Sequence, residues 1–154
     1  MKRYKPLLIA LVIPLAVGGL GALLAGGMSD YGAMVKPPLS PPGWIFPVVW
    51  SILYLLMGLA SWRIWKGDAT MEQKRKALGL YAAQLFLNLL WPILFFRWQL
   101  FLAALVLLIG LWVLIFLTIR AFSKIDEKAA DLLIPYLLWV SFAVYLNFGI
   151  FLLN

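Results

Sequence analysis

The sequence contains no cysteine and no histidine among its 154 residues. The chain therefore has no disulfide, no thiolate nucleophile, no imidazole base and none of the usual ligands of a zinc site. We expect no bound metal and no required cofactor. Charged residues are also scarce, at 12% of the chain, whereas 65% of the residues are hydrophobic. Soluble domains of this length do not have such a composition, so the sequence predicts an integral membrane protein.

Long apolar runs occur five times along the chain. A transmembrane helix needs about 20 apolar residues, and five segments meet this requirement: residues 6–26, 44–65, 77–96, 98–122 and 132–153. These runs leave no room for a soluble domain. We expect residues 1–154 to form a single membrane domain, an all-α bundle of five transmembrane helices.

The first apolar run follows a basic start, so a cleaved signal peptide is the alternative interpretation. The run is longer than the core of a usual signal peptide, and no good A-x-A cleavage site follows it. Gly18, Ala22 and Gly26 also form a small-x-x-x-small ladder, which allows a neighbouring helix to approach closely. We expect a retained transmembrane helix.

The basic residues give the chain a net charge of +7, and they gather between the apolar runs. This clustering favours a topology signal over a nucleic-acid surface. Only Lys36 and Arg97 fall on one side of the predicted bundle. The other side holds Lys2, Arg3, Lys5, Arg63, Lys66, Lys74, Arg75, Lys76, Arg120, Lys124 and Lys128. The positive-inside rule then predicts a cytoplasmic N-terminus and an outer C-terminus.

Proline is concentrated between the first two predicted helices. The run KPPLSPPG at residues 36–43 fixes φ at four positions and removes four backbone donors. It predicts a stiff, proline-rich outer loop. A helix begins after it, because Pro47 falls in a first helical turn, where its missing N–H does least harm.

Aromatic and amide side chains recur at helical spacing in the second, third and fifth predicted helices. Amides that face lipid are costly, so the stripe with Gln84 and Asn88 should face protein or a cavity. Such amides serve either an interhelical hydrogen bond or a ligand site, and the spacing does not choose between them. The simplest arrangement that uses all three aromatic faces is a pocket enclosed by the second, third and fifth helices.

These residues carry a family resemblance across the whole chain. The chain resembles the translocator protein family, whose bacterial members are called tryptophan-rich sensory proteins and whose animal members are called peripheral benzodiazepine receptors. The matching positions are Lys36, Pro37, Pro41, Pro42, Trp44, Phe46, Trp50, Leu53, Tyr54, Met57, Gly58, Leu87, Asn88, Trp91, Phe95, Phe96, Pro135, Tyr136, Trp139, Phe142, Ala143, Leu146 and Asn147.

The resemblance implies a five-helix bundle in the bacterial cytoplasmic membrane, usually a homodimer. It also implies a pocket under the first loop that binds porphyrins such as protoporphyrin IX and drug-like hydrophobic molecules. Carried over by position, the ligand-binding residues would be Tyr31, Pro42, Phe46, Trp50, Tyr54, Asn88, Trp91, Trp139, Phe142 and Ala143.

Two positions depart from the family pattern. Asp30 stands where the family often has a tryptophan ahead of Tyr31, and no lysine or arginine follows Tyr145 as the sterol motif of animal members requires. We therefore do not carry sterol recognition over.

The resemblance and the residues favour a receptor or carrier for metal-free porphyrin. Aromatic walls suit a flat π-system, Lys36 offers a cation for its carboxylates, and the chain has no strong iron ligand. The alternative is an enzymatic role, in which Trp50 and Trp139 support light-dependent oxidative degradation of a bound porphyrin. An ion-coupled transporter fits poorly, because all six acidic residues lie in loops or at helix ends.

Overall fold

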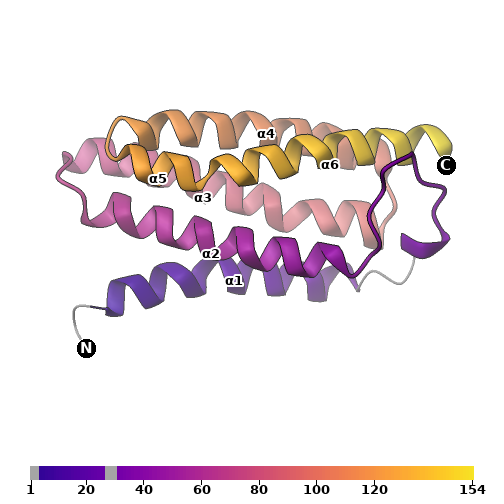
Figure 1. Cartoon of the computed structure of the whole chain (residues 1–154), viewed down its shortest axis with the longest axis horizontal. Coiled ribbons are helices and arrows are strands. Elements are labelled where there is room, and N and C mark those ends of the chain that lie inside the picture. The colour runs from indigo at the N-terminus through magenta and orange to yellow at the C-terminus, as the bar shows by residue number, and fades with distance from the viewer. Residues whose placement is uncertain (1–3, 27–30) are drawn as a thin grey trace.

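The computed structural model describes residues 4–26 and 31–154, and the long elements within them are helices. Five helical spans lie side by side in an elongated bundle (Figure 1). They are α1 (Lys5–Ala25), α2 (Ile45–Lys66), α3 (Met71–Pro92) with its π-helical extension η2 (Ile93–Arg97), α4 (Phe101–Ser123), and α5 (Glu127–Leu132) followed by α6 (Ile134–Leu153). Each span is long and apolar enough to cross a membrane, which confirms the predicted five-helix, all-α class.

The third span begins six residues earlier than predicted. Thr70 Oγ1 accepts a hydrogen bond from the backbone N–H of Gln73 (3.1 Å), and Gln73 Oε1 accepts one from the backbone N–H of Thr70 (3.1 Å). This capping box starts α3 at Met71. The apolar run alone missed this start, because the first turns of α3 are charged.

The fifth span consists of two helices rather than one. Asp126 Oδ1 accepts a hydrogen bond from the backbone N–H of Lys128 (3.0 Å) and so starts α5 at Glu127, ahead of the predicted residue 132. Leu133 separates α5 from α6, because Pro135 has no N–H to continue the helical ladder.

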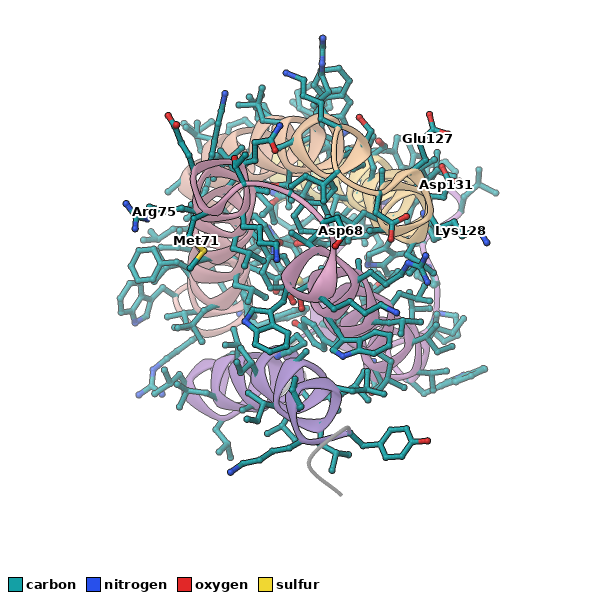
Figure 2. The ribbon with its side chains drawn as sticks, turned by 90° about the vertical axis from the view of Figure 1, so that its left-hand side faces the viewer. Asp68, Met71, Arg75, Glu127, Lys128 and Asp131 are labelled. Carbon is teal, nitrogen blue, oxygen red and sulfur yellow. The ribbon has the colours of Figure 1, made fainter. Side chains whose placement is uncertain are left out.

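The two ends of the bundle carry different connections. The loops α2–α3 and α4–α5 lie at the same end as the start of α1 (Figures 1 and 2). Residues 36–43, which we call the proline segment, lie at the other end together with the C-terminus. Tyr145 Oη donates to the carbonyl of Pro38 (2.6 Å), and the Asn154 side chain exchanges two hydrogen bonds with the backbone of Val35 (3.2 and 2.8 Å). The proline segment is therefore anchored to α6. The predictions for Lys2, Arg3 and Asp30 lie outside the described residues.

Helix α1 is the outermost span. Only 11% of its most apolar 18-residue stretch is buried, against 33% to 39% for the other four spans. It packs against α2, α3 and η2. Two glycines make this contact close: a side chain at Gly18 would overlap the ring of Tyr54, and one at Gly58 would come within 2.5 Å of the carbonyl oxygen of Ala10. The small-residue ladder predicted in the first span thus receives α2 at Gly18.

Candidate functional site

A cavity of about 290 Å³ lies between α1, α2 and α3, toward the end that carries the proline segment. Its α1 wall is made mostly of small side chains, and its α2 and α3 walls are largely aromatic. The lining residues are Leu15, Gly18, Gly19, Ala22 and Ala25 from α1; Phe46, Pro47, Trp50, Ser51 and Tyr54 from α2; Asn88, Trp91 and Pro92 from α3; and Phe96 from η2. Such walls favour a flat apolar guest.

The aromatic walls hold fixed ring arrangements. Trp50 stacks on Tyr54, with ring centroids 5.6 Å apart and planes at 26°. Trp91 meets Phe96 edge to face at 5.7 Å and 81°. Each of these side chains is one or two helical turns from another cavity residue on its own span, so the helices bring the rings together.

A chain of buried hydrogen bonds runs from the cavity into the bundle core. Tyr54 Oη donates to Asn88 Oδ1 (2.9 Å), and Asn88 Nδ2 donates to Tyr136 Oη (2.7 Å). Tyr136 Oη in turn donates to Gln84 Oε1 (2.6 Å). Asn88 therefore makes the interhelical hydrogen bonds that its spacing left open, and it also forms a polar edge of the cavity.

A second buried pair ties the cavity wall to α6. Trp91 Nε1 donates to Asn147 Oδ1 (3.1 Å), and Asn147 Nδ2 donates to the carbonyl of Phe101 (2.9 Å). This arrangement fixes the Trp91 ring in one orientation and satisfies both groups of the Asn147 amide.

The structure places Phe46, Trp50, Tyr54, Asn88 and Trp91 around this one cavity. The fifth span, which was expected to close the pocket, does not line this cavity, and α1 supplies the third wall. Sequence reasoning identified the small residues of the first span as a packing ladder only. Nothing in their spacing shows which side of α2 the first helix covers.

Three expected site residues of α6 lie elsewhere. Trp139 and Phe142 line a more open groove of about 450 Å³ between α2 and α6, and Ala143 is 3% exposed in the core. Trp139 contacts the cavity only indirectly, since its ring meets that of Phe46 at 5.9 Å. Its buried Nε1 has no hydrogen-bond partner among the described residues.

Tyr31 lies over the rim of the cavity. Its ring contacts Phe46 edge to face at 5.1 Å, and its Oη donates to the carbonyl of Pro41 (2.8 Å). Burial raises the pKa of Tyr31, so its hydroxyl remains a donor. Pro42 is exposed beside this contact and does not line the cavity.

Two cations lie at this end of the molecule. The Lys36 ammonium donates to the carbonyls of Tyr31 (3.1 Å) and Met34 (3.0 Å), so it holds the proline segment together. Arg97 Nη1 donates to the carbonyl of Leu24 (2.9 Å) at the end of α1. Arg97 follows the cavity residue Phe96. Sequence reasoning assigned Arg97 no role, although it is one of only two basic residues expected at this end.

Five helices long and apolar enough to cross a membrane define a small multi-pass membrane protein, and three of these spans enclose an aromatic cavity. Residues 10–153 match the TspO/MBR family, and the chain belongs to this family. The resemblance found in the sequence is therefore confirmed.

The relatives come from organisms as different as Chlorobaculum tepidum and Bos taurus. The chain is 41% identical to the tryptophan-rich protein TspO of Chlorobaculum tepidum, over 99% of this chain and 98% of that protein. It is 39% identical to the translocator protein of Bos taurus, over 89% and 83% of the two chains. It is 35% identical to protein CrtK of Rhodobacter capsulatus, over 89% and 85%.

Proposed function

We propose that this protein is a membrane receptor or carrier that binds porphyrins, such as protoporphyrin IX, and similar flat hydrophobic molecules between α1, α2 and α3. The observation that carries the proposal is the cavity, in which Trp50, Tyr54 and Trp91 present aromatic rings opposite a wall of small α1 residues. A flat π-system gains dispersion and offset stacking from such walls.

The small size of the cavity implies that α1 moves outward when a porphyrin binds. Ligand pockets usually measure about 300–1,000 Å³, and this one is at the lower limit with about 290 Å³. A four-ring macrocycle needs more room than that. Helix α1 is the least buried span, so its outward movement is the least costly way to enlarge the site.

The charged rim suits the carboxylates of a porphyrin. Arg97 is exposed near the end of α1, and its guanidinium donates a single hydrogen bond among the described residues, to the carbonyl of Leu24. Its other N–H groups can therefore bind a carboxylate. Lys36 is less suitable than the sequence suggested, because backbone carbonyls already hold its ammonium. With no histidine or cysteine in the chain, metal-free porphyrin fits better than haem.

The names of the relatives are consistent with a receptor or carrier. One relative is called a tryptophan-rich sensory protein and another a translocator protein. We further propose a homodimer in a bacterial cytoplasmic membrane, with the end that carries the α2–α3 and α4–α5 loops in the cytoplasm. The basic residues of that end support this orientation.

Titration of the purified protein with protoporphyrin IX tests the proposal. We expect quenching of tryptophan fluorescence in the wild type and weaker binding in Trp50→Phe, because Trp50 lines the cavity. Trp112→Phe is the matched control, since Trp112 stacks on Phe116 of α4 outside the cavity. Absence of quenching in the wild type, or equal affinity in all three proteins, would contradict the proposal.

Light-dependent oxidative degradation of the bound porphyrin is the second candidate. The stacked pair of Trp50 and Tyr54 at the cavity wall favours it, because an excited porphyrin would lie against an oxidisable ring. Dioxygen would be the oxidant. Trp139 would take part only through Phe46. Illumination of the complex in air should bleach the porphyrin faster than illumination of free porphyrin, and Trp50→Phe should slow this bleaching; equal rates would exclude the reaction.

A further inference from the structure

A second cavity, of about 490 Å³, lies at the opposite end of the same three helices. It is formed by the first half of α1, the last turns of α2 and the middle of α3. Its walls are mainly apolar, with Trp62 and Trp65 on α2 and Lys5 at the start of α1. Tryptophan and lysine are the side chains that proteins place at the headgroup level of a bilayer.

Few polar groups line this second cavity. Ser61 is one of them, but its hydroxyl donates to the carbonyl of Gly58 (2.9 Å). Tyr81 lines the cavity too, but its Oη is fully buried beside Ser61, and its ring meets that of Phe122 of α4 at 6.1 Å. The slot therefore suits an apolar chain.

Cations surround the mouth of this cavity. An adjoining hollow shares Trp65 with it and brings in Lys74 and Arg75 from the first turn of α3. Lys66 covers the ring of Trp62, with its ammonium 4.1 Å from the ring centroid. Figure 2 shows Arg75 on the outer side of α3, away from the acidic side chains of α5. The mouth therefore presents positive charge beside an apolar slot.

We propose that this second cavity binds an anionic phospholipid. Its phosphate lies between Lys5 and Arg75, and one acyl chain fills the slot. Basic pockets between transmembrane helices are suited to anionic headgroups.

Native mass spectrometry from nanodiscs that contain equal amounts of phosphatidylglycerol and phosphatidylcholine tests the charged part of the site. We expect the wild type to retain phosphatidylglycerol preferentially, and Arg75→Gln to lower this preference about fivefold. Lys128→Gln is the matched control, because Lys128 is exposed at the same end of the bundle but on the opposite side (Figure 2). Equal retention of both lipids, or equal loss in both variants, would overturn the proposal.

Filling the slot gives an independent test. Ala82 lines the cavity and is exposed, so Ala82→Trp should occupy the place of the acyl chain and abolish lipid retention. Ala103→Trp adds the same bulk at an exposed position on α4 and should leave retention unchanged. Retention by Ala82→Trp would overturn the proposed site. If Ala82→Trp does not fold, the exposed substitution Arg75→Gln still decides the outcome.

Discussion

The hollows on the two sides of α2 each hold a tryptophan, Trp50 of α2 on the α1 side and Trp139 of α6 on the other, yet they differ in kind. On the α1 side, Trp50 lies in a cavity with a polar edge formed by Tyr54 and Asn88. On the α6 side, Trp139 lies in a more open groove that is lined only by apolar and aromatic side chains, and its N–H has no partner among the described residues. The neighbours of a tryptophan, rather than its presence, distinguish the candidate site from the apolar groove.

The two sides also differ in how α2 is held. Toward α1, glycines allow the helix backbones to approach closely, and α1 itself is mostly exposed to lipid. Toward α5, Arg63 Nε donates to Asp126 Oδ2 (2.7 Å), and this ion pair joins α2 to the first residues of the fifth span. The two contacts of α2 therefore differ in kind, with close backbone packing toward α1 and an ion pair toward α5.

The largest expected effect follows from crowding the close contact between α1 and α2. In Gly58→Ala the new Cβ would lie 2.5 Å from Ala10 O and 2.8 Å from Leu11 Cα, so the backbone of α1 must move. We expect a loss of about 1–3 kcal/mol in the free energy of unfolding. Gly19→Ala, where no heavy atom lies within 4 Å, should be neutral or slightly stabilising. Equal melting temperatures for the two variants would refute the close contact.

Removal of the polar edge should have the next largest effect. Asn88→Leu leaves the hydroxyls of Tyr54 and Tyr136 without their amide partner, although Tyr136 keeps Gln84. We expect a loss of about 1–2 kcal/mol in the free energy of unfolding and a lower affinity for protoporphyrin IX. Leu87→Met, a swap of similar volume on the same helix, is the control. Unchanged stability and affinity in Asn88→Leu would mean that the hydrogen-bond chain does not support the cavity.

A smaller, pH-dependent effect is expected on the other side of α2. Burial alone would raise the pKa of Asp126, but hydrogen bonds from Arg63 and from the backbone of Lys128 outweigh it and lower that pKa below the ordinary 3.8. The ionised Asp126 therefore stabilises the folded state fully above about pH 3.8, and this stabilisation is lost as the pH falls through the lowered pKa.

Asp126→Asn should remove this acid sensitivity while it keeps the helix cap, because asparagine is also a good N-cap. At neutral pH the loss should be at most about 1 kcal/mol, as for other partly exposed ion pairs. Thermal unfolding between pH 3 and pH 7 measures it, with Asp131→Asn as the control. An identical pH profile for Asp126→Asn and the wild type would show that the ion pair does not contribute.

The smallest effect is expected in the α6 groove. Trp139→Phe removes an N–H that has no described hydrogen-bond partner, so it should change stability by less than about 1 kcal/mol. Trp91→Phe is the counterpart on the cavity side, where the same change leaves Asn147 Oδ1 without its donor and should cost more. Equal losses of stability in Trp139→Phe and Trp91→Phe would contradict the proposed difference between the two sides of α2.

Much of this architecture could be predicted from the sequence. The lengths of the apolar runs gave five spans, and the i, i+4 and i, i+3 spacing placed Trp50 with Tyr54 and Asn88 with Trp91 on common faces. The early starts of α3 and α5 were missed because the caps at Thr70 and Asp126 lie outside the apolar runs.

The third wall of the cavity could not be predicted, because helix order around a bundle is decided by packing. On α6 the buried stripe passes through Tyr136, Val140, Ala143 and Asn147, which turns Trp139 toward the groove. The periodicity of the fifth span allowed either stripe to face inward. Glycines at the α1 contact decide which helix covers the aromatic face of α2, and their role is visible only when both helices are in place.

The absence of cysteine permits a direct test of the central claim that the guest binds on the α1 side of α2. Ala22→Cys places a thiol in the cavity wall, and Leu138→Cys places one in the α6 groove. The rate of alkylation by a small membrane-permeable maleimide is then measured with and without protoporphyrin IX. We predict that the porphyrin slows alkylation of Ala22→Cys and leaves Leu138→Cys unchanged. Protection of Leu138→Cys alone would contradict the account.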